Sequence, residues 1–213
     1  YAGIICNLLF RACVQASCLL LIFVKKCYME LRDLPSGKTA FYRFDAPGGP
    51  RAVILLVHGL GEHAGRYSVW ASRFTEKGVT MLAFDLPGHG RTPGRWGVMP
   101  SPEKVYDTID KILGEAADEY PGVPLFLYGH SLGGGLVLNY LIRRKPSLTG
   151  SIVTSPWVIL SEAPPPVKVF LAKMAGTLMP GMTQPSGLKT EYISRDPEVV
   201  KDYRHDPLIH GQI

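Results

Sequence analysis

The chain has 213 residues, of which 46% are hydrophobic and 19% are charged, so it is long and apolar enough to bury a sizeable core. This composition excludes a disordered or fibrous protein. The net charge of +5 comes from scattered basic residues and not from one patch, which argues against nucleic-acid binding. All four cysteines lie within the first 27 residues, and their spacings match no metal-binding motif.

Residues 1–28 form an apolar extension, and their segment 4–24 has about the length of a membrane span. Polar residues interrupt that segment, and its central Arg11 would cost roughly 2.5–3.5 kcal/mol on insertion. The segment also lacks the basic start and the cleavage site of a signal peptide. Three interpretations stay open: an upstream extension of the reading frame with Met29 as the true start, a membrane anchor, or a buried helix.

The first half of the remaining chain reads as strands with one helix. Alternating apolar and polar residues on both sides of Pro35-Ser36-Gly37 predict an antiparallel hairpin. The β-branched run at 52–59 predicts a strand that is buried on both faces. A helix over 66–77, a buried strand over 79–85 and a Gly/Pro-rich loop over 86–100 follow.

The second half continues the alternation of helices and strands. Ser101-Pro102-Glu103 is a helix start signal, and the helix that it opens carries a stripe of five apolar side chains, namely Val105, Ile109, Ile112, Leu113 and Ala116. Strands are predicted at 124–130 and 150–156, with a helix over 132–144 between them. We therefore predict an α/β fold over 29–156, with a doubly wound and mostly parallel sheet.

Residues 157–213 have a different character and are predicted to form a helical cap or lid that folds over the sheet. A proline-bounded helix carries apolar residues at helical spacing, namely Val167, Phe170, Leu171, Met174 and Leu178. This stripe either packs the cap onto the body or lines an acyl-chain tunnel. Polar, turn-rich sequence is expected from there to the end.

A serine stands between two glycines at the junction of a predicted strand and a predicted helix. Gly129-His130-Ser131-Leu132-Gly133 matches the G-x-S-x-G pattern of a nucleophile elbow, which needs this strand–turn–helix context. The glycines allow the tight turn that lifts the serine hydroxyl above the sheet. We predict Ser131 as a nucleophile, with the backbone N–H of Leu132 facing developing negative charge at a helix N-terminus.

A second glycine-containing loop follows the strand at 52–58 and is predicted to supply the other oxyanion donor. The backbone N–H of Leu60 is the candidate, with Gly59 and Gly61 supporting the loop. His58 is expected to brace this loop through hydrogen bonds, and His63 to order it without acting as a base. Structural roles are expected for two residues of the next loop, Asp85 and His89.

Four motifs, taken in order, resemble the monoacylglycerol lipase and lysophospholipase branch of the α/β-hydrolases, which is similar to serine aminopeptidases of type S33. They are HGLGEHAGRY (58–67), FDLPGHGRT (84–92), GHSLGGG (129–135) and SRDPEVVKDYRHDPL (194–208). The resemblance covers about residues 30–213. It implies Ser131 as nucleophile, the amides of Leu60 and Leu132 as oxyanion donors, and a cap from about residue 157. Leu132 stands where the family commonly has methionine.

The partners of a serine triad are harder to find in this sequence. In this fold the acid and then the histidine follow the serine along the chain. Only His205 and His210 come after Ser131, in the segment that resembles the end of the cap, with no predicted strand before them. We therefore expect the triad acid and base, and the last sheet strands, to lie beyond residue 213. The chain as given is then expected to be inactive and poorly soluble.

The leading hypothesis is a serine carboxylester hydrolase that acts on small acyl esters such as monoacylglycerols or lysophospholipids. One alternative is an aminopeptidase or amidase with the same machinery, since both chemistries pass through a tetrahedral intermediate. The other is a truncated, inactive hydrolase-like protein that only binds. No cofactor, metal or nucleic acid is expected. A cytoplasmic or membrane-associated location is expected, with peripheral membrane contact through the cap or the N-terminal segment.

Overall fold

The computed structural model describes residues 27–159, 165–179 and 181–213. The interpretations of residues 1–28 therefore fall outside the described residues, except that Cys27 and Tyr28 belong to the first strand. Within the described residues, no helix is both long and apolar enough to cross a membrane.

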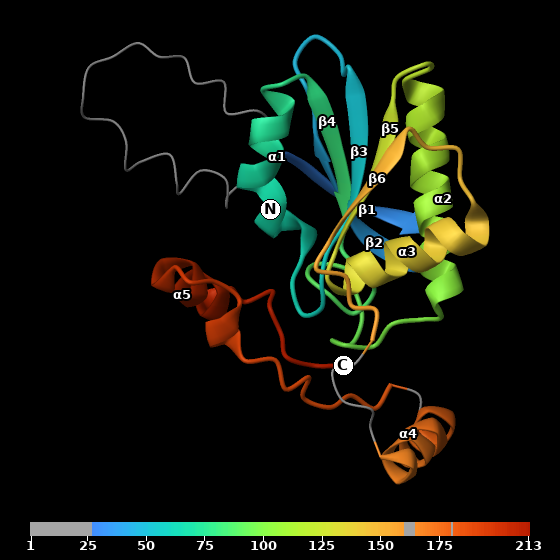
Figure 1. The fold of residues 1–213 in the computed structure, drawn as a ribbon, viewed down its shortest axis with the longest axis vertical. Helices are drawn as coiled ribbons and strands as arrows, with labels where there is room; N and C mark the ends of the chain where they lie inside the picture. The colour runs from blue at the N-terminus through green and yellow to red at the C-terminus, as the bar shows by residue number, and fades with distance from the viewer. Residues whose placement is uncertain (1–26, 160–164, 180) are drawn as a thin grey trace.

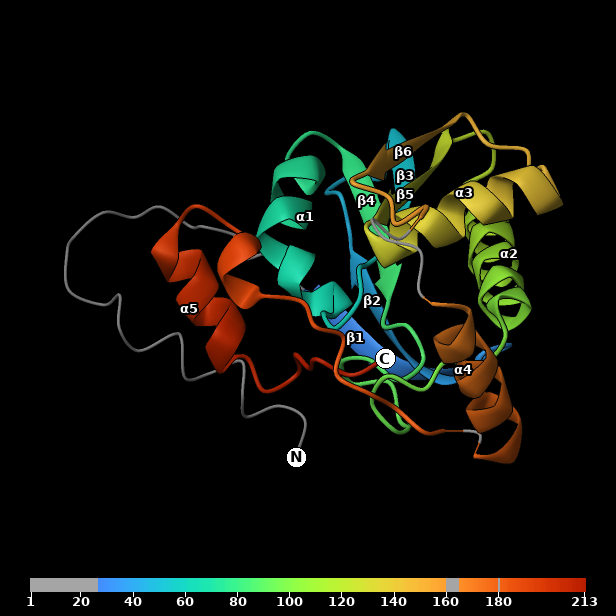
Figure 2. The ribbon, with the colours of Figure 1, turned by 60° about the horizontal axis from the view of Figure 1, so that its bottom comes forward.

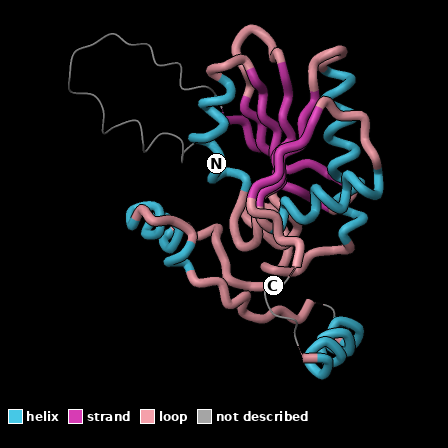
Figure 3. Tube along the Cα trace, in the orientation of Figure 1, coloured by secondary structure: helices cyan, strands magenta, loops and turns pink. Residues whose placement is uncertain are grey.

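A six-stranded sheet forms the centre of the molecule (Figures 1 and 3). The strands lie in the order β1-β2-β4-β3-β5-β6. β1 pairs antiparallel with β2, and β2 with β4, while the other neighbours are parallel. The strands are β1 (Cys27–Leu34), β2 (Gly37–Phe44), β3 (Ala52–Val57), β4 (Val79–Phe84), β5 (Leu125–His130) and β6 (Gly150–Thr154). The predicted hairpin, the mostly parallel order and all four later strands are confirmed.

Helices cover both faces of this sheet, as the alternating sequence predicts (Figure 1). The short 3-10 helix η2 (Ala64–Tyr67) and α1 (Ser68–Thr75) pack on one face, where Ile54, Leu56 and Met81 are buried. The helices α2 (Pro102–Glu119) and α3 (Leu132–Arg144) pack on the other face, over Leu55, Phe84 and Leu127. β3 and β4 are buried on both faces because their apolar runs lie between these two layers.

Some predicted boundaries shift in the structure. The helix expected over 66–77 starts as η2 at Ala64 and ends at Thr75, where Gly78 follows with a φ of 77°. Ser101 does precede α2, but its side chain makes no capping hydrogen bond, so Pro102 in the first turn carries the start signal. α3 spans 132–144, which are the predicted bounds.

The region after β6 differs most from expectation. The predicted helix appears as α4 (Pro166–Leu178), but its apolar stripe is largely exposed among the described residues: Phe170 is 62% and Leu178 72% exposed. The sequence to the end is not simply turn-rich, because it contains the 3-10 helix η3 (Thr190–Tyr192) and α5 (Pro197–His205). Neither α4 nor α5 covers a face of the sheet. Both lie beyond the end of the parallel strands at which Ser131 stands (Figures 1 and 2).

α5 begins at a cap that the sequence displays. The Asp196 side chain accepts a hydrogen bond from the Glu198 N–H (2.9 Å), and Pro197 occupies the first turn. Asp196-Pro197-Glu198 is thus the same kind of start signal as Ser101-Pro102-Glu103. The expectation of turn-rich sequence to the end of the chain is therefore wrong for residues 197–205.

Candidate active site

Ser131 occupies a strained turn between β5 and α3. Its φ of 53° and ψ of −116° place a non-glycine residue in a rarely adopted region. Neighbouring backbone holds it there: the Ser131 N–H donates to the Thr154 carbonyl (3.0 Å), and the Trp157 N–H donates to the Ser131 carbonyl (2.8 Å). Such strain is costly, and it persists where the surrounding structure imposes it.

The two glycines around the serine stand where no side chain fits. A Cβ on Gly129 would lie 2.6 Å from the Gly133 carbonyl oxygen. A Cβ on Gly133 would lie 2.1 Å from the Val57 carbonyl oxygen on the neighbouring strand. α3 can therefore start directly against the ends of β3 and β5, and this close approach is the physical reason for the G-x-S-x-G pattern here.

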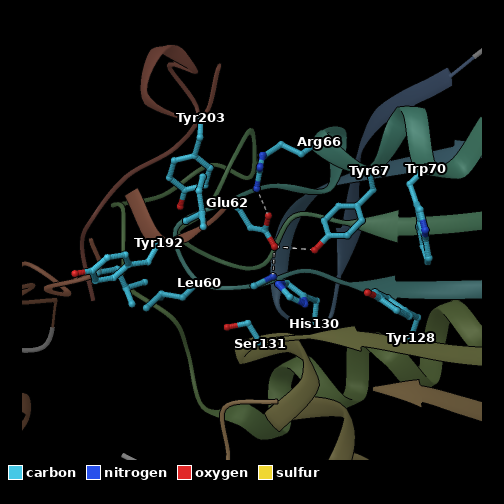
Figure 4. Close-up of a pocket in the computed structure, with 13 residues that line it drawn as sticks. Leu60, Glu62, Arg66, Tyr67, Trp70, Tyr128, His130, Ser131, Tyr192 and Tyr203 are labelled. Carbon is cyan, nitrogen blue, oxygen red and sulfur yellow. Dashed lines mark hydrogen bonds and ion pairs between the residues drawn. The ribbon is translucent and has the colours of Figure 1, made fainter. Parts of the chain in front are cut away.

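A cavity of about 570 Å³ opens at Ser131 (Figure 4). The serine hydroxyl points into it, with the Leu60 side chain nearby. The body and the C-terminal region both contribute to the lining, so the cavity lies between them. The lining residues are Gly59, Leu60, Glu62, Arg66, Tyr67, Trp70, Tyr128, His130, Ser131, Leu188, Tyr192, Ile193 and Tyr203.

Glu62 organises the loop that carries Leu60. Its Oε1 accepts hydrogen bonds from the Gly59 N–H (2.7 Å) and from the Tyr67 hydroxyl (2.8 Å), and Arg66 forms an ion pair with Oε2. Burial, followed by the nearby Glu62 carboxylate, raises the pKa of Tyr67. The Tyr67 phenol therefore remains a hydrogen-bond donor. The Glu62 carboxylate holds the loop, and both of its oxygens have partners.

His58 is buried beneath the same loop as a neutral imidazole. Its Nε2 accepts a hydrogen bond from the Leu86 N–H (2.9 Å), so Nδ1 carries the proton and donates to the Gly59 carbonyl (2.8 Å). Burial, together with the neighbouring His89, lowers its pKa well below the ordinary value. Both ring nitrogens are thus engaged with backbone.

Gly61, further along the loop, has a φ of 73°, and a Cβ there would meet the His210 carbonyl at 2.4 Å.

Asp85 and His89 make structural contacts inside the body. The Asp85 carboxylate accepts hydrogen bonds from the Tyr42 hydroxyl (3.0 Å), the Ala64 N–H (2.7 Å) and the Arg91 N–H (2.8 Å). His89 Nδ1 lies 3.0 Å from the Pro87 carbonyl. Burial lowers the pKa of His89 to about 4, and burial raises the pKa of Asp85.

The C-terminal region docks on the glycine loops through polar groups. His63 Nε2 donates to the Asp206 carboxylate (2.8 Å), and the His210 N–H donates to the Gly61 carbonyl (3.0 Å). The pKa of Asp206 is lowered: partial burial opposes the shift, and the hydrogen bonds from His63 and the Leu208 N–H outweigh it. His63 therefore orders the loop and ties it to the C-terminal region.

No imidazole is hydrogen bonded to Ser131 Oγ among the described residues, which include all six histidines of the chain. His205 bonds the Lys201 carbonyl on α5, and His210 Nε2 donates to the Gly88 carbonyl (2.9 Å). His130, the nearest in sequence, bonds Thr154. Within the described part, no group of three or more His, Cys, Asp or Glu side chains could hold a metal ion.

Several cavity residues were not anticipated from the sequence. Glu62 and Arg66 both lie in the motif HGLGEHAGRY (58–67). Opposite charges four residues apart are a sequence signal for the ion pair that the structure contains. Tyr192 and Tyr203 reach the cavity only through the path of the C-terminal region, which local sequence does not reveal. Trp157 lines a separate cavity of about 240 Å³ against α3.

The fold defines the class, an α/β-hydrolase, and comparison with known proteins narrows it. The sequence profile of the family described as serine aminopeptidase, S33, matches residues 48–213. The chain belongs to this family, in its monoacylglycerol lipase-like branch. It is 37% identical over 161 residues to a monoacylglycerol lipase of Mycolicibacterium smegmatis and 33% identical over 187 residues to a monoglyceride lipase of Mus musculus.

Coverage of these relatives is partial. The matches take in 76% and 84% of this chain, but 57% and 61% of the two relatives. Among solved structures, a Paleococcus ferrophilus monoacylglycerol lipase is 38% identical with a TM-score of 0.72, over 82% of this chain and 65% of that one. A soluble monoglyceride lipase variant of Saccharomyces cerevisiae, 24% identical with a TM-score of 0.73 over 92% and 67% of the two chains, supports the fold alone.

Proposed function

We propose that this chain carries the nucleophile and the oxyanion site of a serine carboxylester hydrolase that acts on monoacylglycerol-like esters. Ser131 Oγ gives up its proton to a base and attacks the ester carbonyl carbon. The tetrahedral oxyanion then collapses, the bond to the leaving oxygen breaks, and that oxygen takes up the proton and departs as the alcohol. Water then hydrolyses the acyl-serine to free the fatty acid. The observation that carries this proposal is the strained Ser131 backbone at the mouth of a 570 Å³ cavity.

Two backbone amides are the proposed oxyanion donors. Leu132 is the first residue of α3, where N–H groups have no intrahelical acceptor and the helix dipole favours negative charge. Leu60 follows Gly59, whose own N–H is fixed by Glu62. Neither the Leu60 nor the Leu132 N–H is engaged by a described protein atom. A preorganised donor of this kind contributes about 3–4 kcal/mol to transition-state stabilisation.

The general base is not among the bonded partners of Ser131, so slow turnover by this chain is part of the proposal. Serine is a weak nucleophile until an imidazole accepts its proton. His58, His63 and His210 are each committed to other groups through the bonds described above. We expect the chain to bind acyl esters and to acylate Ser131 slowly, and free imidazole in solution to accelerate that step.

The substrate class rests on the relatives and on the cavity together. The relatives include monoacylglycerol lipases and, at 29% identity over 160 residues, the phospholipase YtpA of Bacillus subtilis. Leu60, Leu188 and Ile193 give the cavity apolar walls for an acyl chain, while Glu62, Arg66 and Tyr203 provide polar groups for an alcohol. An amide substrate would use the same serine, so the leaving group has to be tested directly.

The exposed stripe of α4 gives the proposed cap a further role. Val167, Phe170, Leu171 and Leu178 are all more than half exposed, and single-chain proteins rarely present such a stripe to water. We propose that α4 touches the lipid surface from which the substrate comes, which makes the protein peripherally membrane-associated. Replacement of Phe170 and Leu171 by serine should reduce co-sedimentation with phosphatidylcholine vesicles, and unchanged binding would contradict this role.

A substrate panel tests the proposed function. The chain is incubated, with and without imidazole, with monoacylglycerols, lysophosphatidylcholine and aminoacyl anilides, and Ser131→Ala serves as the control. We expect imidazole-dependent release of fatty acid from monoacylglycerol by the native chain and none by Ser131→Ala. Anilide cleavage in preference to ester cleavage would favour the amidase alternative. Equal ester hydrolysis by both chains would refute the nucleophile.

A further inference from the structure

Three side chains meet beside Ser131 where β5 and β6 end. Tyr128 and His130 are two residues apart on β5, so they share one face of the sheet. The parallel register places Thr154 of β6 opposite His130. The Thr154 hydroxyl oxygen lies 2.7 Å from the Tyr128 hydroxyl and 2.9 Å from His130 Nδ1. One hydroxyl therefore bridges two residues that line the cavity.

The direction of the hydrogen bonds follows from what each group can donate. If the phenol donates to Thr154 and Thr154 donates to His130 Nδ1, every hydroxyl hydrogen in the chain of contacts has an acceptor. In the reverse direction, Nδ1–H donates to Thr154 and Thr154 to the phenol oxygen. The phenol hydrogen then has no partner among the described residues, although Tyr128 is only 7% exposed. A third arrangement, in which Thr154 accepts from both neighbours, leaves the Thr154 hydrogen without a described acceptor. Because an unpaired buried donor costs about 1–3 kcal/mol, the first direction is favoured: it alone gives both hydroxyl hydrogens an acceptor.

We propose that Thr154 is a positioning residue that fixes both the orientation and the tautomer of His130. With Nδ1 as acceptor, the proton resides on Nε2, for which no partner is found among the described residues. His130 thus offers the cavity a hydrogen-bond donor beside the nucleophile. That a bound ester receives this bond rests on the proposed function, whereas the tautomer does not.

The surroundings hold this bridge rigidly. The Tyr128 ring packs on Trp70 with centroids 4.9 Å apart, so its hydroxyl has a fixed position. The Thr154 carbonyl accepts the Ser131 N–H at 3.0 Å, and the next residue, Ser155, has a φ of 43°. The same residue therefore controls the elbow through its backbone and His130 through its side chain. Removing the hydroxyl alone separates the two roles.

The test is the imidazole ¹⁵N spectrum of His130 in the full chain, at about pH 8, where an ordinary imidazole is neutral. Loss of the His130 signals in His130→Gln assigns them. We expect the native protein to carry the proton on Nε2. In Thr154→Val, the ratio of the Nε2–H to the Nδ1–H form should fall about five- to tenfold, the factor that one net hydrogen bond supplies.

Thr154→Ser, which keeps a hydroxyl, should restore the native ratio. Thr154→Ala is a second variant without the hydroxyl in case the valine protein fails to fold, which the amide spectrum reports. A proton on Nδ1 in the native chain, or an unchanged ratio in the folded valine and alanine variants, would overturn the proposal. Because the spectrum does not depend on Ser131 reacting, failure of the ester hydrolase proposal would appear separately, as absent hydrolysis with a native His130 spectrum.

Discussion

The body of the molecule and the region after β6 use their apolar residues in opposite ways. Every hydrophobic residue that is buried in the described chain lies between Leu34 and Tyr140. After β6, the large apolar side chains of α4 are exposed, and the region is held to the body by polar contacts such as His63–Asp206. The turn that carries Ser131 belongs to the packed body, but one wall of its cavity comes from the loosely held region.

The cavity at Ser131 has one closely packed side and one side with little burial. Close packing fixes the elbow, since Gly133 leaves no room for a methyl group between α3 and β3. Tyr192 and Tyr203, by contrast, belong to η3 and α5, neither of which contains a buried residue. The turn at Ser131 thus belongs to the closely packed body, whereas the opposite wall of the cavity comes from elements that bury no residue.

Replacing a leucine by alanine in each region should give the largest difference in the free energy of unfolding. Leu55→Ala, in a strand where the side chain is 0% exposed, should lower the free energy of unfolding by about 2–5 kcal/mol. Leu171→Ala on α4, where the side chain is 56% exposed, should change it by less than about 0.5 kcal/mol. Urea unfolding monitored by circular dichroism measures both. Equal losses would abolish the distinction between the regions.

The two regions should also differ in how a histidine affects the pH dependence of stability. Burial lowers the pKa of His89 to about 4, so on acidification the unfolded chain takes up this proton first, near its ordinary value of about 6.5. The stability that His89 contributes is therefore present above about pH 6.5 and is lost as pH falls toward 4. The loss from His89 amounts to up to about 3 kcal/mol.

The measurement is the urea midpoint at pH 7 and at pH 4.5. His89→Gln should weaken the dependence on pH, whereas His205→Gln, the same change on exposed α5, should retain the native dependence. A native protein that is more stable at pH 4.5 than at pH 7 would show that the buried imidazoles do not control acid stability.

The smallest expected effect concerns the contact that joins the two regions. Asp206→Asn removes the charge partner of His63 but keeps an oxygen that can accept its hydrogen bond. The side chains of this pair are only 9% and 25% exposed, and we expect the change to lower global stability by about 1 kcal/mol. Amide hydrogen exchange should nevertheless accelerate near Asp206, whereas residues 209–213 should change less because His210 is also hydrogen bonded to Gly61 and Gly88. Lys201→Gln, on the exposed face of α5, is the control. Faster exchange throughout the sheet would indicate that the two regions unfold together.

The body could be predicted from the sequence because each of its elements carries a local signal. The apolar runs of β3 and β4, the proline start of α2 and the glycines around Ser131 depend on neighbouring residues alone. The exposure of α4 could not be predicted, since an apolar stripe specifies that a surface needs covering and not what covers it. α5 could be predicted as well, because Asp196-Pro197-Glu198 is a helix start signal.

Only part of the candidate site could be predicted from the sequence. Ser131 and the two glycine loops follow from motifs. The bridge from Tyr128 through Thr154 to His130, by contrast, depends on the register of β5 against β6. The role of Glu62 depends on the local loop conformation, which brings its carboxylate to the Gly59 N–H. Contacts of this kind are tertiary, so residue spacing alone does not reveal them.

In the proposed function, the strained turn presents Ser131 as the nucleophile. The most direct test of this role is reaction with a fluorophosphonate probe, followed by peptide mass spectrometry to locate the label, with and without imidazole. We expect a single label on Ser131, slow by itself and faster with imidazole, and no label in Ser131→Ala. A label on another residue, or equal labelling of Ser131→Ala, would contradict this role.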